Sequence, residues 1–319
     1  MEILKEIANC PGEILHSCVT IGNFDGCHLG HQKLLEMTLK HKQDWNSKSI
    51  AITFDPNPKF YFGAPNTNQH LFTTEMKREF FHQMGFDYFV EQPFDESFSR
   101  LTPERFYHLI NSLHPKSITV GSNFLFGYKR QGDCKFLMEK SQNDQFIFDA
   151  VEAVTVDDQP VSSSRIREAL QTNGDISTAT QLLTRPYFLL GQVIHGRKEG
   201  RKIGFPTANL GDVRQIIPKN GVYCGFVSIN PTNKITPFIN DRQKHPAVLN
   251  IGTRPTYQDT SQSQSVEIHI LSSSDLELYD NEIGFQFIDR IRDERKFTDI
   301  SALREQISQD VSTAKRLLS

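Results

Sequence analysis

The stretch Thr20–Leu35, TIGNFDGCHLGHQKLL, places two histidines and three glycines directly after a β-branched run. The run has the composition of a buried strand ending at Gly22, and leucines at helical spacing predict a helix from about His31. A loop that enters a helix N-terminus offers unpaired N–H groups to an anion, and glycines let phosphate oxygens approach the backbone. We therefore predict a phosphate-binding loop here, with His28 and His31 as hydrogen-bond donors.

Strand-like and helix-like segments alternate through the first half of the chain. The predicted strands are SIAITF (49–54), DYFVEQPF (87–94) and SITVGSNFLFG (117–127). The predicted helices are TEMKREFFHQMGF (74–86), TPERFYHLINSLHP (102–115) and SSSRIREALQTNG (162–174), bounded by proline or glycine. This alternation predicts an α/β fold with a Rossmann-like, mostly parallel sheet.

The pattern changes near residue 184. Five short strands follow, punctuated by glycine, proline and asparagine, in segments 188–194, 221–229, 246–252, 265–271 and 282–292. They predict a small antiparallel β-barrel. A terminal helix begins after Asp299, the expected N-cap, and its apolar face carries Ile300, Leu303, Ile307, Val311, Ala314 and Leu318. We predict two domains, residues 1–183 and residues 184–319.

Composition restricts the class of protein. The 319 residues carry a formal net charge of −3, which argues against a dedicated nucleic-acid binder. The five cysteines are odd in number and scattered, so neither a disulfide framework nor a thiolate zinc site is expected. The start, MEILKEIANC, lacks an apolar signal region, and no apolar run approaches the ~20 residues of a membrane span. We expect a cytoplasmic protein with no membrane and no nucleic acid among its partners.

A second group of phosphate-binding side chains follows from the segment SSSRIREAL (162–170). Ser163 and Ser164 offer hydroxyl donors near a helix start, and Arg167 offers a planar fork that suits phosphate. Taken alone, Arg167 is equally compatible with an exposed position on a helix. The two histidines upstream are compatible with a metal pair, although no third ligand has suitable local spacing.

Four motifs occur in one order along the chain: TFDPNP (53–58) and VGSNFLFG (120–127) lie between the histidine loop and SSSRIREAL. In that order they resemble the FAD synthetase module of bacterial bifunctional riboflavin kinase/FAD synthetases, within the nucleotidyltransferase superfamily. The resemblance implies that the phosphate of FMN attacks the α-phosphorus of ATP and that pyrophosphate leaves. Two positions depart from the family pattern, Asn57 where many relatives carry histidine and Ser164 where threonine is common, and we expect altered rates rather than lost activity.

The same resemblance implies roles for individual residues. His28, His31 and Arg167 are implied as catalytic residues, and together with Ser163 and Ser164 they would hold the ATP phosphates. Asn123 would lie on the FMN side. The nucleotide site would be completed by Gly22, Asn23, Phe24, Asp25 and Gly30.

The segment GRKEGRKIGFPTANL (196–210) combines glycines, basic residues and Pro-Thr-Ala-Asn. It lacks the spacing of a Walker A loop, but its composition suits a loop that folds over phosphates. Thr207 and Asn209 lie two apart, so on an extended segment their oxygen atoms face the same side, as ligands of Mg²⁺ would. Glu267, in the alternating strand SVEIHIL, is able to accept a proton from a hydroxyl or to be an ordinary outward-facing residue.

Together with NIGTRPTY (250–257) and IRDERKF (291–297), these segments resemble the riboflavin kinase module of the same bifunctional family. The resemblance implies that Thr207 and Asn209 bind the Mg²⁺ of ATP and that Glu267 is the base that activates the ribityl 5′-hydroxyl. Arg292, Glu294 and Phe297 would border the flavin. The ATP site of this module would further include Arg201, Lys202, Gly204 and Pro206.

The sequence thus predicts an enzyme that converts riboflavin into FMN and FMN into FAD, with ATP as co-substrate and Mg²⁺ as cofactor. Its ligands would be riboflavin, FMN, FAD and ATP, and a homo-oligomer stays open. Two other hypotheses remain. One is a nucleotidyltransferase with a different phosphate ester as acceptor, which would have no need of the barrel. The other is a flavin-binding regulator that has lost turnover, for which degraded motifs are expected and none is severely degraded.

Overall fold

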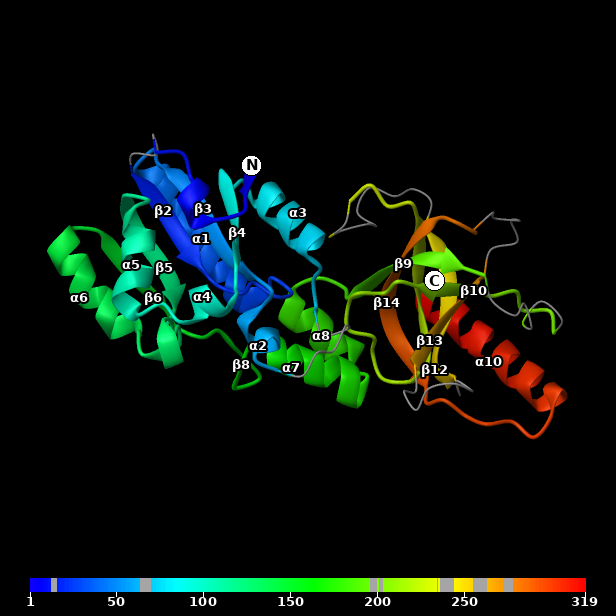
Figure 1. Ribbon diagram of the computed structural model, residues 1–319. Helices are drawn as coiled ribbons and strands as arrows, with labels where there is room; N and C mark the ends of the chain where they lie inside the picture. The colour runs from blue at the N-terminus through cyan, green and yellow to red at the C-terminus, as the bar shows by residue number, and fades with distance from the viewer. Residues whose placement is uncertain are drawn as a thin grey trace. The chain divides into compact units, whose positions relative to one another are not determined.

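The chain folds into two compact units in a computed structural model (Figure 1). One unit comprises residues 1–66 and 74–161, and the other comprises residues 67–73 and 162–319. The boundary that the sequence predicts, between 183 and 184, lies at the end of a helix and stays a prediction. The structure describes residues 1–12, 16–63, 70–195, 200, 203–233, 235, 244–254, 263–271 and 278–319.

The first unit is built on a six-stranded, wholly parallel sheet in the order β1-β4-β3-β2-β5-β6. Its central strands are almost continuously apolar and buried, as a sheet covered on both faces requires. The prediction of a Rossmann-like parallel sheet is confirmed. The strands are β1 (Glu2–Leu4), β2 (Ser17–Ile21), β3 (Lys48–Asp55), β4 (Tyr88–Pro93), β5 (Pro115–Gly121) and β6 (Ile147–Val151).

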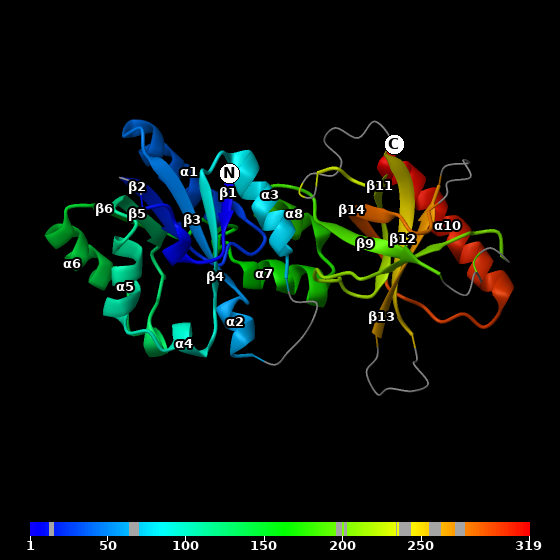
Figure 2. The same ribbon diagram turned by 45° about the horizontal axis from the view of Figure 1, so that its top comes forward.

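Helices connect these parallel strands (Figures 1 and 2). The helix α1 contacts β2 and β5, and α6 contacts β6. Thr102 caps α5 by accepting a hydrogen bond from the Arg105 N–H, with Pro103 at the first helical position. The helices are α1 (Leu29–Asp44), α2 (Pro58–Tyr61), α3 (Thr74–Met84), α4 (Glu96–Ser99), α5 (Pro103–Asn111) and α6 (Cys134–Asp144); 3₁₀ turns lie at Ile7–Asn9 and Tyr128–Arg130, and β7 (Thr155–Val156) pairs with β8 (Gln159–Pro160).

A buried carboxylate of this unit is held by two basic side chains. Glu91 on β4 has a side chain only 1% exposed, and Arg78 of α3 donates to it from Nε (2.5 Å) and Nη2 (2.6 Å). Lys5 adds a third bond of 2.9 Å. Burial raises the pKa of Glu91, but the hydrogen bonds and charges of Arg78 and Lys5 outweigh it and hold the pKa below the ordinary 4.5.

The second unit begins with a helical segment made of α7 (Ser163–Glu168), a π-helical turn (Ala169–Asn173) and α8 (Ile176–Leu183). It packs on the barrel at Gly174, whose φ is +67°. A Cβ there would lie 2.7 Å from Nε of Arg290 and 3.1 Å from the Tyr223 hydroxyl, so only glycine fits. The Lys219 N–H also donates to the Leu170 carbonyl (2.9 Å).

The rest of the second unit is a closed, antiparallel, six-stranded barrel in the order β10-β13-β12-β11-β14-β9, with β9 pairing back to β10. The predicted barrel is confirmed, and so is its terminal helix α10 (Ile300–Leu318), which is capped by Asp299. The strands are β9 (Phe188–Ile194), β10 (Ala208–Gly211), β11 (Gly221–Ile229), β12 (His245–Arg254), β13 (Ser263–Ile270) and β14 (Glu282–Arg292).

The helix α10 lies on the outer face of β11, β12 and β14 (Figure 2). Its Ala314 is fully buried, and Val311 packs in the same cluster against Val222, Cys224 and Val248 of the barrel. The prediction that Ile300 belongs to the apolar face is wrong. Its side chain, in the first turn of the helix, is 68% exposed.

Candidate active sites

The histidine loop connects β2 to α1 at the carboxyl edge of the parallel sheet. His28 is the N-cap of α1, and its Nδ1 accepts a hydrogen bond from the His31 N–H (3.3 Å). The two imidazole rings stack with centroids 3.7 Å apart and an angle of 15° between their planes. The structure therefore brings the two predicted histidines together at the N-terminus of a sixteen-residue helix, where the macrodipole favours an anion.

Two glycines permit this close arrangement. A Cβ on Gly30 would lie 3.3 Å from Cε1 of His28, and a Cβ on Gly22 would lie 3.0 Å from the ring of Phe24. Phe24 is fully buried and meets the His31 ring edge-on at 5.5 Å. Asp25 is also buried, whereas Asn23 is exposed.

Asn123 lies just past the end of β5, at the same edge of the sheet, and is exposed. Behind it runs an unbroken chain of ring contacts that ends on Phe62, which is 72% exposed. Phe62 was not among the predicted site residues, although it closes the aromatic triplet FYF (60–62) that follows DPNPK. The chain passes through Phe124, Phe126, Phe106, Phe98, Phe94 and Phe62.

Asn57, one of the two departures from the family pattern, is 5% exposed and caps the short helix α2. Its Oδ1 accepts a hydrogen bond from the Lys59 N–H (3.0 Å). The carboxamide therefore serves as the N-cap of the helical turn that leads to Phe62.

The predicted residues of SSSRIREAL lie on α7, in the second compact unit. Ser162, rather than Ser163 or Ser164, caps this helix by accepting from the Arg165 N–H (3.2 Å). The capping role is thus filled by a residue outside the predicted set. Ser164 is exposed and Arg167 half-buried, on a helix that Ile166 anchors by complete burial.

On the barrel, Asn209 of β10 lies directly opposite Glu267 of β13 in the antiparallel register. Directly opposed residues point to the same face of a sheet, with Cβ atoms about 5 Å apart. Val266 and Ile268, which flank the glutamate, are 3% and 1% exposed and face the barrel interior. The predicted Mg²⁺ ligand and the predicted base are therefore neighbours on the outer face.

Thr207 precedes β10, and the carbonyl of Pro206 before it accepts a hydrogen bond from Nδ1 of His269 (2.8 Å). This bond fixes the entry of the Pro-Thr-Ala-Asn segment against β13. Gly204, with φ of +88°, makes the turn before it. The predicted ATP-binding residues Arg201 and Lys202 lie outside the described residues.

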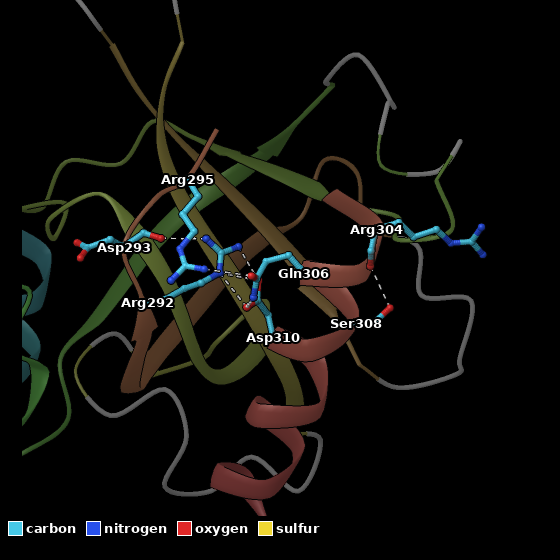
Figure 3. Close-up of polar contacts among 7 residues, drawn as sticks. All are labelled: Arg292, Asp293, Arg295, Arg304, Gln306, Ser308 and Asp310. Atoms are coloured by element: carbon cyan, nitrogen blue, oxygen red, sulfur yellow. Dashed lines mark hydrogen bonds and ion pairs between the residues drawn. The ribbon is translucent and has the colours of Figure 1, made fainter. Parts of the chain in front are cut away.

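Arg292 ends β14, and its guanidinium holds Asp310 of α10 (Figure 3). Nε lies 2.9 Å and 3.1 Å from the two carboxylate oxygens, and Nη2 lies 2.7 Å from Oδ2. The Asp310 side chain is 4% exposed, and Gln306 donates a further bond of 3.0 Å to it. The structure thus gives the predicted flavin-bordering arginine a partner in the terminal helix.

The other two predicted flavin residues follow Arg292 in the chain. Phe297 lies beneath the Arg292 guanidinium, 5.9 Å from ring centroid to Cζ. The exposed Glu294 accepts a hydrogen bond from Nδ2 of Asn220 (3.1 Å), and that amide also donates to Thr253 (2.8 Å). All three predicted residues are therefore ordered by contacts within the barrel unit.

Over the described ranges, no group of three histidine, cysteine, aspartate or glutamate side chains is arranged to hold a metal ion. No helix in that part of the chain combines the length and hydropathy that a bilayer crossing needs. The five cysteines all lie in the described ranges, and none forms a disulfide.

Two family models match the chain. The one for FAD synthetase matches residues 12–165, and the one for riboflavin kinase matches residues 183–318. A bifunctional riboflavin kinase/FMN adenylyltransferase of Haemophilus influenzae is 35% identical over 318 residues, which cover 99% of this chain and 98% of that protein. A protein of the same name from Bacillus subtilis is 35% identical over 307 residues, or 95% of this chain and 93% of that protein.

A solved structure is also similar. A crystal structure described as a macrolide-efflux protein from Streptococcus pneumoniae matches with a TM-score of 0.84 and 26% identity, covering 98% of each chain. The likeness extends over both the parallel sheet and the barrel.

Proposed function

Because the chain belongs to the family of bifunctional riboflavin kinase/FMN adenylyltransferases, we propose how its own residues carry out the two reactions of that family. Both the FAD synthetase and the riboflavin kinase domains are present. The kinase phosphorylates riboflavin to FMN with ATP, and the adenylyltransferase transfers the adenylyl group of a second ATP to FMN, giving FAD and pyrophosphate. We infer the role of each residue from its geometry together with membership of the family.

In the kinase reaction, Glu267 accepts the proton of the ribityl 5′-hydroxyl as its oxygen attacks the γ-phosphorus of ATP, and ADP leaves. The observation that carries this assignment is the cross-strand pairing of Glu267 with Asn209. It supports a base and a Mg²⁺ ligand on adjacent strands, within reach of one phosphoryl group.

Magnesium fits the donors present. The Thr207 hydroxyl and the Asn209 carboxamide oxygen are hard, neutral ligands, and Mg²⁺ commonly binds through few protein ligands together with nucleotide phosphates. When bound, the ion would neutralise charge on the phosphates of ATP. The chain itself orients the Pro-Thr-Ala-Asn segment through the bond between His269 and Pro206.

In the adenylyl-transfer reaction, a phosphate oxygen of FMN attacks the α-phosphorus of ATP and the bond to pyrophosphate breaks. No protein nucleophile is required, so the protein contributes positioning and charge stabilisation. His28 and His31 donate hydrogen bonds to phosphate oxygens at the N-terminus of α1. Ser163, Ser164 and Arg167 supply the phosphate contacts of the SSSRIR motif.

The isoalloxazine of FMN needs a large apolar surface in the adenylyltransferase. The exposed ring of Phe62 at the carboxyl edge of the sheet, continuous with Phe94 and Phe98 behind it, supports its placement there. Asn123 at the same edge offers a carboxamide to the polar atoms of the flavin.

The absence of disulfides among the cysteines supports a reducing compartment, and we propose the cytoplasm as the location.

A product assay tests the proposal. Purified protein is incubated with riboflavin, ATP and Mg²⁺, and flavins are separated chromatographically over time. FMN should appear first and FAD second, and FMN supplied directly should yield FAD and pyrophosphate. Failure to form FMN contradicts the kinase assignment, and failure to form FAD from supplied FMN contradicts the adenylyltransferase assignment.

A further inference from the structure

One row of side chains crosses five strands on the outer face of the barrel. Asn209, Glu267 and Asn250 are successive partners across β10, β13 and β12. The same register continues through Val222 of β11 to Arg292 of β14. Three of the five residues are predicted kinase residues, and Asn250 lies between them without an assigned role.

Asn250 faces outward like its neighbours in the row. Leu249 and Ile251, on either side of it in β12, are fully buried and face the barrel interior. Val248, two residues earlier and therefore on the same face as Asn250, packs against the apolar side chains of α10. Asn250 itself is partly exposed, just past the edge of that apolar cluster.

The next outward position on β12 is Gly252, and it brings Glu294 close to Asn250. A Cβ on Gly252 would lie 2.6 Å from Oε1 of Glu294 and 3.5 Å from Nδ2 of Asn250. The carboxamide of Asn250 therefore has Glu267 across the strand on one side and Glu294 above Gly252 on the other. The missing side chain lets the Glu294 carboxylate lie close over β12, beside the carboxamide.

This placement suits a polyol. Both flanking carboxylates only accept hydrogen bonds, whereas a carboxamide donates through Nδ2 and accepts through Oδ1. The hydroxyls of a ribityl chain likewise donate and accept. A chain whose terminal hydroxyl reaches Glu267 and whose ring lies toward Glu294 would place its intervening hydroxyls at Asn250.

We propose that Asn250 is a substrate-binding residue of the kinase site that holds the intervening ribityl hydroxyls of riboflavin between Glu267 and Glu294. The inference rests on the proposed kinase function and adds the orientation of the two substrates along the row. The phosphoryl donor lies on the β10 side of the row and the flavin ring on the β14 side.

The test compares two flavins with two enzymes. One flavin is riboflavin, and the other is its 10-(5-hydroxypentyl) analogue, which keeps the ring and the terminal hydroxyl but lacks the intervening hydroxyls. Asn250→Ala should lower kcat/KM for riboflavin about tenfold, mainly through KM, as expected for the loss of one or two hydrogen bonds. With the analogue the loss should stay below about twofold, because those bonds are absent from the start. If the analogue turns over slowly, its inhibition constant against riboflavin provides the same comparison.

Controls separate binding from folding. Asn230→Ala removes an asparagine just past the opposite end of β11 and should leave the riboflavin KM unchanged. Formation of FAD from supplied FMN should persist in Asn250→Ala, and Asn250→Ser, which keeps a hydroxyl, should recover part of the lost kcat/KM. Equal losses with both flavins, or no loss with riboflavin, overturn the role of Asn250 while leaving the kinase assignment intact. A wild-type chain that phosphorylates neither flavin overturns both.

Discussion

The guanidinium of Arg292 and the carboxylate of Asp310 form a nearly buried ion pair that joins the last residue of β14 to the terminal helix (Figure 3). The two side chains are 13% and 4% exposed, with a shortest distance of 2.7 Å. The segment carrying Glu294 and Phe297 leaves the strand directly after this pair. The terminal helix therefore has a second role besides covering the barrel, because it holds the start of the segment that is predicted to border the flavin.

Asp310→Asn should destabilise the barrel unit by about 3 kcal/mol, because the change leaves a mostly buried arginine without its counter-charge. Denaturant-induced unfolding measures the loss. Glu305→Gln removes an exposed carboxylate from the same helix and should cost less than about 0.5 kcal/mol. Equal effects of the two substitutions would contradict a structural role for the pair.

His28→Ala and His28→Asn should both lower the rate of FAD formation from FMN by about 10²–10³, since alanine has no donor and the shorter asparagine side chain does not place its N–H where the imidazole N–H lies. The two variants should differ in stability. Asparagine still caps α1, whereas alanine loses the cap at a cost of about 1 kcal/mol. Measured rates of FMN formation should not change in either variant. His82→Ala, an exposed histidine on α3, serves as the control and should leave both reactions unaffected.

Glu267→Gln should lower FMN formation by about 10²–10⁴, as expected for the loss of a general base, while FAD is still made from supplied FMN. Steady-state assays of the two half-reactions on one preparation give the comparison. Glu305→Gln again provides the control. Simultaneous loss of both activities in a folded variant would mean that the two reactions do not use separate residues.

Gly252→Ala should raise the KM for riboflavin about fivefold without affecting the KM for ATP, because the new Cβ displaces the carboxylate of Glu294 from its bond with Asn220. The effect should disappear in a Glu294→Ala background, where there is no carboxylate to displace. Gly12→Ala, where a Cβ meets nothing within 4 Å, is the matched control. A KM increase that persists without Glu294 would rule out this explanation.

Acid should weaken the first unit through Glu91. Its folded pKa lies below 4.5, so the ionised carboxylate contributes stability that is present above that pH and is lost as the pH falls through the folded pKa. The free-energy difference between wild type and Glu91→Gln should therefore be largest near neutral pH and should shrink below about pH 4. Unfolding curves at several pH values measure it, and a difference independent of pH would contradict the linkage.

Sequence patterns predicted the local elements well because strand burial and helix caps are local properties. The apolar run around Ile50 and the cap at Asp299 needed no knowledge of distant residues. Cross-strand register is not local. Nothing in the spacing of Asn209, Glu267 and Asn250 along the chain indicates that the pairing of β10, β13 and β12 aligns them in one row.

Ion pairs between side chains of different elements were equally impossible to predict from local sequence. The sequence assigned Asp310 no role, and the structure buries it against Arg292. The apolar Ile300 shows the opposite behaviour. It is exposed, because the first turn of the helix does not pack on the barrel. The motif residues are recognisable from local sequence, whereas the contribution of Arg292 to the fold depends on a partner 18 residues away in another element.

The fit of Gly174 against Arg290 has an evolutionary consequence. A hybrid made by exchanging barrels between relatives at residue 184 would take the residue at position 174 from one parent and the residue at position 290 from the other. Any side chain at the glycine position would then meet the incoming arginine, so a functional hybrid requires a crossover upstream of the helical segment. Exchanges placed at 161/162 should yield folded hybrids more often than exchanges placed at 183/184.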